Sequence, residues 1–247
     1  MAKIDKSYHK LINQILSDGF LYEDPNRKGV RRIQIPSYKF EHSFKDGFPA
    51  ITTKKLYWKG IVGELIWFLR GDTNIKYLLD NKIHIWDKDA YNHFLKDKPE
   101  LTKCTSPNKC INIPFDINNE THKDLFLGNV LQGNDGFGGL GKIYGGQWRN
   151  WTNFVGNNGN ALYYNNVDQF QNLIQGLKDN PMSTQHIVTA WNPAELDKMA
   201  LPPCHWSFEI LVEPLPDNRL KKYSENIMYE HSNLLDGIEY QFTLKWH

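Results

Sequence analysis

One cysteine in this sequence stands where a nucleophile could be presented. The stretch Leu201-Pro202-Pro203-Cys204-His205-Trp206 precedes an alternating run that predicts a strand ending at Val212. The two prolines hold the chain extended and remove two backbone donors. A rigid backbone before a thiol at the mouth of a strand could aim Cys204 for covalent catalysis. The alternative is that Cys204 is a small buried apolar residue, as most free cysteines are.

A carboxylate inside an apolar helix is the second candidate for chemistry. The pattern from Trp58 to Leu69 predicts a helix, and Glu64 has apolar neighbours on both sides. If Glu64 is buried, its pKa is raised and it can carry a proton. The alternative is that it points outward beside Lys59 or Arg70.

A third candidate is the polar, turn-rich segment 23–32, which carries four basic residues and Gly29. Such a loop can wrap an anion. The residues alone favour the simpler interpretation, an exposed basic loop without a ligand.

Composition narrows the class of protein. The chain has 247 residues, 40% hydrophobic and 23% charged, which is typical of a globular chain. Its formal net charge of +1 argues against a general nucleic-acid-binding surface, so we expect no DNA partner. The three cysteines, Cys104, Cys110 and Cys204, form no CxxC or zinc pattern, and an odd count without a secretory signal favours the cytoplasm. Because the cysteines and histidines form no zinc pattern, we expect no metal. No apolar run approaches the roughly 20 residues that cross a bilayer, so we expect no membrane span.

The elements that must position these side chains alternate between helices and strands. We expect helices at 8–20, 58–69, 71–79 and 167–178, and strands at 33–44, 186–190, 206–212 and 240–246. We expect a polar loop at 150–166. We also expect an insertion at about 96–139, with at most short helices or strands of its own. This mixture predicts an α+β fold, with helices covering a mixed, largely antiparallel sheet, in one domain spanning 1–247.

Several blocks occur in the order of one known family. They are Asp46-Gly47-Phe48-Pro49, Thr52-Thr53-Lys54-Lys55, the run from Glu64 to Asn74, Ile85-Trp86-Asp87, Tyr144-Gly145-Gly146-Gln147-Trp148-Arg149, Asp168-Gln169, Ala190-Trp191-Asn192-Pro193, and the run from Met199 to His205. On these blocks the chain resembles thymidylate synthase over nearly its whole length, apart from 96–139 and 214–238.

The resemblance implies reductive methylation of deoxyuridine monophosphate (dUMP). Both the one-carbon unit and the hydride would come from 5,10-methylenetetrahydrofolate. A thiolate that adds to carbon 6 of uracil makes carbon 5 an enolate-like nucleophile, which attacks the methylene group. The resemblance also implies a homodimer.

The resemblance assigns roles to individual residues. It makes Cys204 the nucleophile, Glu64 the carboxylate that organises proton transfers, and Tyr144 the tyrosine that helps to remove the carbon 5 proton through water. The implied substrate-binding residues are Arg27, His205 and Gln185. The implied folate-binding residues are Trp86, Tyr57, Lys54 and Leu201.

The sequence departs from the family pattern in two places. Thr184 and Gln185 stand where the family usually carries two arginines that reach the partner subunit's phosphate, and an amide holds phosphate less well than a guanidinium fork. His186 could supply some positive charge there. The sequence also stops at His247, before further family segments that bind substrate, so we expect a C-terminally incomplete domain with low or no activity.

Two other functions stay open. A pyrimidine hydroxymethylase would share the cysteine and the folate but add water in place of hydride. A catalytically silent homologue would bind nucleotide, RNA or a partner subunit without turnover.

Overall fold

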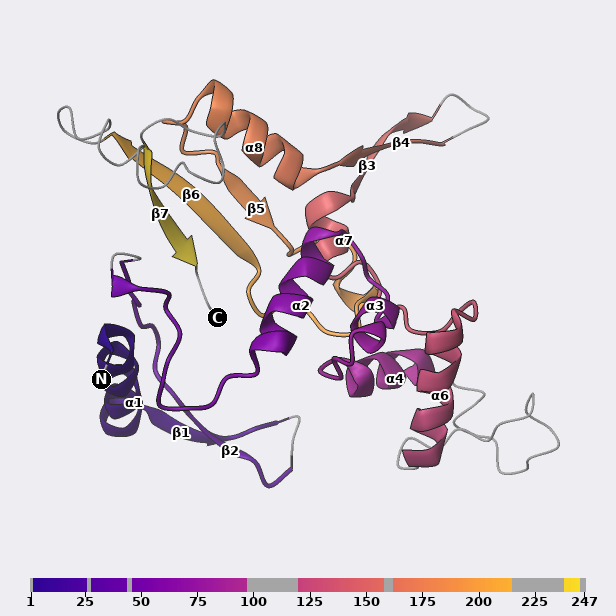
Figure 1. Ribbon diagram of the computed structural model, residues 1–247, viewed down its shortest axis with the longest axis horizontal. Coiled ribbons are helices and arrows are strands. Elements are labelled where there is room, and N and C mark those ends of the chain that lie inside the picture. Colours follow the sequence, from indigo (N-terminus) through magenta and orange to yellow (C-terminus); the bar gives the residue numbers. More distant parts are fainter. Residues whose placement is uncertain are drawn as a thin grey trace. The chain divides into compact units, whose positions relative to one another are not determined.

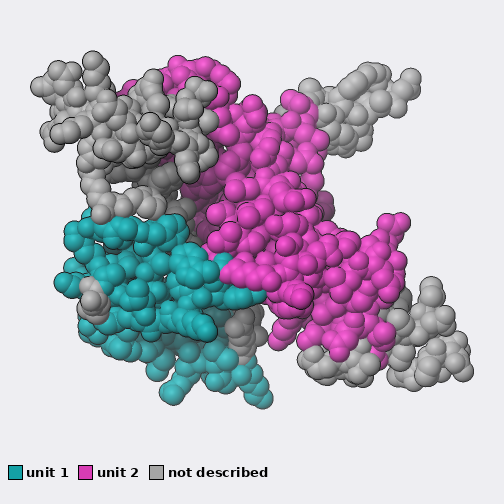
Figure 2. Space-filling model, in the orientation of Figure 1, with its two compact units in different colours: residues 1–58 teal, residues 59–247 magenta. Residues whose placement is uncertain are grey.

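The computed structural model describes residues 2–25, 28–43, 46–96, 120–157, 162–214 and 238–244 (Figure 1). It comprises two compact units, residues 1–58 and 59–247, which Figure 2 shows in different colours. The single domain expected from the sequence stays a prediction. Among the described residues, no helix is both long enough and apolar enough to cross a membrane.

The first unit joins a helix to a short hairpin. Helix α1, Lys3–Asp18, is followed by the antiparallel strands β1, Phe20–Glu23, and β2, Arg31–Gln34. The prediction of a strand over 33–44 is wrong beyond Gln34, where β2 ends. Pro36 has no N–H group to donate to a neighbouring strand.

A buried carboxylate ties the start of α1 to a distant segment. Asp5 accepts hydrogen bonds from the backbone N–H of Thr52 (2.7 Å) and from its hydroxyl (2.6 Å). It also accepts from the N–H of Ala2 at 3.1 Å.

The second unit contains most of the helices. They are α2 (Trp58–Leu69, which begins on the last residue of the first unit), α3 (Lys76–Asp80), α4 (Asp87–Lys96), α6 (Glu120–Gln132), α7 (Tyr144–Arg149), α8 (Gln169–Asp179) and the 3₁₀ turn η2 (Leu196–Lys198). Helix α2 has the bounds expected from its periodicity. Helix α8 begins where Asp168 caps it, since the Asp168 carboxylate accepts from the N–H of Gln171 at 2.9 Å.

Among the described residues of this unit, the strands form two antiparallel sheets. Strands β5 (Ile187–Thr189), β6 (Ser207–Pro214) and β7 (Ile238–Leu244) form a three-stranded sheet in that order. Thr189 pairs with Ser207, and Phe208 pairs with Leu244. Helix α8 packs against β5 (Figure 1). The α+β fold with antiparallel sheets is confirmed.

The prediction of a polar loop at 150–166 is wrong. Strands β3 (Trp151–Asn157) and β4 (Leu162–Val167) form an antiparallel hairpin, with an irregularity in register between Phe154 and Gly156. Aromatic and aliphatic residues that favour strands occur in both arms, and the intervening asparagines and glycines hide their alternation in the sequence.

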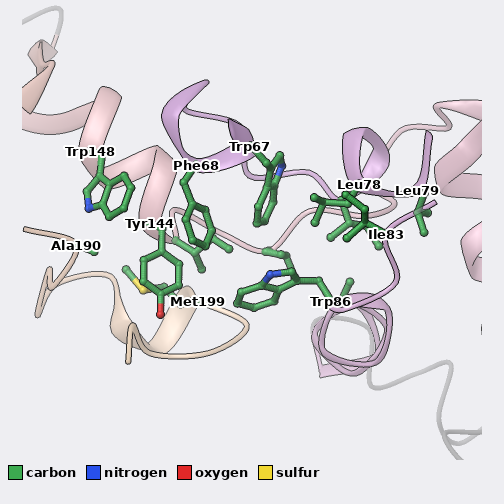
Figure 3. Close-up of a cluster of buried hydrophobic side chains, with 14 of the residues drawn as sticks. Trp67, Phe68, Leu78, Leu79, Ile83, Trp86, Tyr144, Trp148, Ala190 and Met199 are labelled. Atoms are coloured by element: carbon green, nitrogen blue, oxygen red, sulfur yellow. The ribbon is translucent and has the colours of Figure 1, made fainter. Parts of the chain in front are cut away.

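The core of the second unit gathers aromatic and aliphatic side chains from α2, α3, α4 and α7. Figure 3 shows Trp67, Phe68, Trp86 and Tyr144 within this cluster. It supports the site directly, since Tyr144 and Trp86 are also predicted functional residues.

Helix α6 is longer than the short elements expected within 96–139. Phe126 is fully buried, and its ring centroid lies 5.5 Å from that of Tyr91 and 5.1 Å from that of Phe94. The helix is therefore held by aromatic packing on α4. Residues 97–119 of the expected insertion lie outside the described residues.

Candidate active site

Cys204 lies on an anchored segment just before β6. The residue is exposed and its thiol is free, which excludes the alternative of a buried core cysteine. The segment is held before and after the cysteine: the N–H of Ala200 donates to the Leu140 carbonyl (3.0 Å), and the Trp206 carbonyl accepts from the N–H of Ala190 (2.7 Å). The backbone of Cys204 is thus fixed while its side chain reaches solvent.

Tyr144, the first residue of α7, is bonded directly to the cysteine backbone. Its hydroxyl oxygen accepts the N–H of Cys204 at 2.8 Å. Burial raises the pKa of Tyr144 to about 12, and the N–H groups of Cys204 and His205 offset only part of that rise. The negative charges of Cys204 and Glu64 raise the pKa further, so Tyr144 is a neutral phenol at physiological pH.

Aromatic rings enclose Tyr144 and fix its orientation. The imidazole of His205 stacks on it, with centroids 4.5 Å apart and planes at 26°. Phe68 lies 4.4 Å away by ring centroids, and Trp86 meets the ring edge-on at 6.5 Å (Figure 3). Burial in this cluster lowers the pKa of His205, so its imidazole is neutral near pH 7.

Glu64 on α2 turns toward the aromatic cluster. The indole N–H of Trp86 donates to its carboxylate at 2.6 Å. The outward orientation beside Lys59 or Arg70, which the sequence left open, is therefore wrong. Burial raises the pKa of Glu64, and the bond from Trp86 partly opposes that rise. A half-buried carboxyl with a raised pKa holds its proton more readily than an ordinary glutamic acid, which suits a proton carrier.

The structure therefore brings five of the predicted site residues together in one cluster, with Tyr144 at its centre. Tyr144 contacts the backbone of Cys204, stacks on His205 and meets Trp86, and Trp86 holds Glu64. This cluster thus contains an exposed thiol, a neutral hydroxyl and a carboxyl of raised pKa. This combination can perform nucleophilic addition followed by proton transfer.

The remaining predicted folate-binding residues are exposed. Leu201 is exposed three residues before the cysteine. Lys54 and Tyr57 are exposed residues of the first unit, and Arg27 lies outside the described residues. Their predicted roles stay predictions.

Gln185 is exposed and lines an open cavity of about 340 Å³ between α8 and β5. His186, in the same cavity, is buried, and its Nε2 donates to the Asn180 carbonyl at 3.0 Å. The imidazole of His186 is thus turned into the chain rather than toward a phosphate in solvent.

Sequence reasoning missed a buried polar network behind α7. Gln147 is fully buried; its amide donates to the Lys142 carbonyl (2.8 Å) and to the Glu195 carboxylate (2.7 Å). The amide of Asn192 donates to Gln147 Oε1 at 3.2 Å. The one sequence signal was the glutamine inside the short block Tyr144 to Arg149. A helix of six residues is too short for its hydrophobic periodicity to show whether this glutamine is buried or exposed. Among the described residues, no three His, Cys, Asp or Glu side chains gather as a metal site.

The chain is similar to proteins of one known family. A family model described as thymidylate synthase matches residues 6–232. Thymidylate synthase of Mesoplasma florum is 37% identical over 209 residues, 84% of this chain and 62% of the relative. Thymidylate synthases of Mycoplasma genitalium and Mycoplasma pneumoniae are each 38% identical, over 84% and 76% of this chain and 62% and 56% of their own lengths. The chain thus spans less than two thirds of each of these relatives.

Proposed function

The chain belongs to the thymidylate synthase family, and from this premise we propose that it methylates dUMP to dTMP with 5,10-methylenetetrahydrofolate. The observation that carries the proposal is the exposed thiol of Cys204, whose backbone N–H is bonded to the buried hydroxyl of Tyr144. A nucleophile on a fixed backbone beside a group that can handle protons is what addition to a pyrimidine ring requires.

Cys204 begins the proposed reaction. Its thiolate forms a bond to carbon 6 of uracil, and the electron pair displaced from the ring moves to carbon 5 and the carbonyl oxygen at carbon 4. Carbon 5 then bonds to the methylene carbon of the folate, while the bond from that carbon to nitrogen 10 breaks and its electron pair goes to the nitrogen. Loss of the carbon 5 proton drives cleavage of the bond from the methylene carbon to nitrogen 5, which leaves an exocyclic methylene group on the pyrimidine and releases tetrahydrofolate. A hydride from the tetrahydrofolate then adds to this methylene group, which gives the methyl group and dihydrofolate, and the carbon–sulfur bond breaks to return the thiolate.

Two residues handle protons in this scheme. Tyr144 stays neutral, so its hydroxyl takes part by relaying the carbon 5 proton through water rather than as a phenolate. Glu64 has a raised pKa, which lets it hold or release a proton beside the pyrimidine. The hydrogen bond from Trp86 orients the Glu64 carboxyl, leaving the indole ring to lie against the folate.

The remaining assignments complete the proposal. His205, Arg27 and Gln185 contact the nucleotide, and Tyr57, Lys54 and Leu201 contact the folate. We further propose a homodimer that acts in the cytoplasm without a metal.

The test uses dUMP carrying tritium at carbon 5, incubated with the chain and 5,10-methylenetetrahydrofolate. Release of tritium into water, with dTMP and dihydrofolate in equal amounts, supports the proposal even at a slow rate, provided that Cys204→Ser shows none. A hydroxymethylated nucleotide without dihydrofolate would assign the hydroxymethylase reaction instead. Tritium release no faster than in Cys204→Ser would contradict both.

A further inference from the structure

Two side chains outside the proposed machinery join the elements that hold Cys204. Gln169, the first residue of α8, donates through Nε2 to the carbonyls of Gln147 and Thr189, both at 2.8 Å. Its Oε1 accepts the N–H of Thr189 at 2.9 Å. One amide side chain thus binds α7 and β5 with three hydrogen bonds.

Thr189 continues the connection toward the cysteine. Its hydroxyl donates to the carbonyl of Trp206 and accepts the N–H of Trp191, both at 3.1 Å. Trp206 is two residues after Cys204, at the entry to β6. The hydroxyl therefore holds the carboxyl-terminal end of the cysteine segment.

These bonds close a ring through the site. From Cys204 the ring runs to the hydroxyl of Tyr144, along α7 to Gln147, through Gln169 to Thr189, and through Trp206 back to the cysteine. A shift of α7 relative to β5 would therefore change the distance between the Tyr144 hydroxyl and the Cys204 backbone.

We propose that Gln169 and Thr189 are positioning residues, which act through α7 and β5 to set where the Cys204 thiol stands. The proposal rests on the proposed function for its kinetic consequence. Its structural part, the tethering of the Cys204 segment, stands independently. We call the hydrogen bonds made by the Gln169 and Thr189 side chains the clamp. Because a displacement near 1 Å can cost roughly a hundredfold in rate, we expect loss of the clamp to slow adduct formation about tenfold or more.

Thr189 offers a matched pair of variants. Thr189→Val keeps the shape and the strand preference of the residue but loses the hydroxyl, whereas Thr189→Ser keeps the hydroxyl. We expect Thr189→Val to speed amide hydrogen exchange in the peptide around 200–206, with exchange in α2 unchanged, and Thr189→Ser to restore slow exchange.

Gln169→Glu supplies a test by pH. A carboxylate cannot donate to the two carbonyls, whereas a neutral carboxyl can donate to one of them. Adduct formation with fluorodeoxyuridylate and 5,10-methylenetetrahydrofolate should be slowed, and the ratio of variant to parent rate should rise as the pH falls from about 8 to about 5.5. Gln171→Glu, an exposed change on the same helix, is the control and should leave the rate unchanged.

The outcomes separate the possibilities. Parent-like adduct rates in both Gln169→Glu and Thr189→Val would overturn the proposal. So would an increase in exchange spread evenly over the second unit with a lower melting temperature, since that marks a merely structural role. If the parent chain forms no adduct, the proposed function fails, while the exchange of Thr189→Val against Thr189→Ser still decides whether the clamp exists.

Discussion

Replacing Tyr144 with phenylalanine separates the two tasks that the structure gives this residue. The ring contacts survive in Tyr144→Phe, because Phe68 at 4.4 Å and the imidazole of His205 at 4.5 Å stack against the ring. The change removes only the oxygen, which accepts the Cys204 N–H at 2.8 Å and interacts with the backbone N–H of His205.

The cost in stability should be small. A hydrogen bond between neutral groups contributes about 1 kcal/mol, and Cys204 is exposed, so water can replace part of the lost bond. For a chain of this length that corresponds to a melting temperature lower by about 2–4 °C. If the lost bond served only to place the thiol, adduct formation would slow about fivefold.

Turnover should suffer far more than adduct formation. A positioned group that moves a proton contributes ~10²–10⁴-fold to a rate. Fluorodeoxyuridylate carries fluorine where dUMP carries the proton, so trapping with this analogue reports only the steps before proton removal.

The assay compares both rates in the same preparations. Rapid quenching gives the rate of trapping, and tritium release from carbon 5 gives the rate of turnover, each for the parent and for Tyr144→Phe. We expect a several-fold loss in the first and at least a hundredfold loss in the second. Equal losses in both rates would refute the division of labour, and so would a fall in melting temperature of ten degrees or more, which would mean that the hydroxyl is a major support of the fold.

Two further substitutions and one control test the carboxyl of Glu64 and the packing of α7 on α2. Glu64→Gln keeps an acceptor for the Trp86 indole but cannot ionise. Because the pKa of Glu64 is raised on folding, the folded parent binds this proton more tightly than the unfolded parent does. The stability of the parent therefore falls as the pH rises from the ordinary carboxyl pKa of 4.5 toward the raised one. Melting curves should therefore show Glu64→Gln more stable than the parent at about pH 8 and equal to it near pH 4, and a gap of constant size would count against the raised pKa. Gly145→Ala would place a methyl group 2.6 Å from the Phe68 carbonyl oxygen and 3.0 Å from that of Asp72, so urea unfolding should show a loss of about 1–3 kcal/mol. Gly128→Ala on α6 meets nothing within 4 Å and should be neutral or stabilising, and similar losses in the two variants would contradict the close approach of α7 to α2.

The parts of this fold that could be predicted are those that local sequence determines. Helix α2 has the expected bounds because its run of apolar residues has helical length and few competing signals. The direction of Glu64 within that helix could not be predicted, because its partner Trp86 lies 22 residues later and the periodicity permits either face.

The site shows the same division. Cys204 could be singled out from two prolines and a following strand, but the bonds that anchor its segment come from Tyr144 and Leu140 at distant positions in the sequence. The β3–β4 hairpin was missed because its asparagines suggested a loop. The roles of Gln147 and Gln169 depend on backbone carbonyls that only the folded chain brings within reach, so no spacing in the sequence marks them.

Trapping the covalent adduct identifies the residue that bonds to the nucleotide, which we propose is Cys204. The chain is incubated with fluorodeoxyuridylate and 5,10-methylenetetrahydrofolate, denatured and digested, and its peptides are weighed by mass spectrometry. We expect the peptide that contains Cys204 to carry both nucleotide and folate, and the peptides with Cys104 and Cys110 to stay unmodified. An unmodified Cys204 at saturating concentrations of both compounds, in a chain with an intact melting transition, would contradict the account.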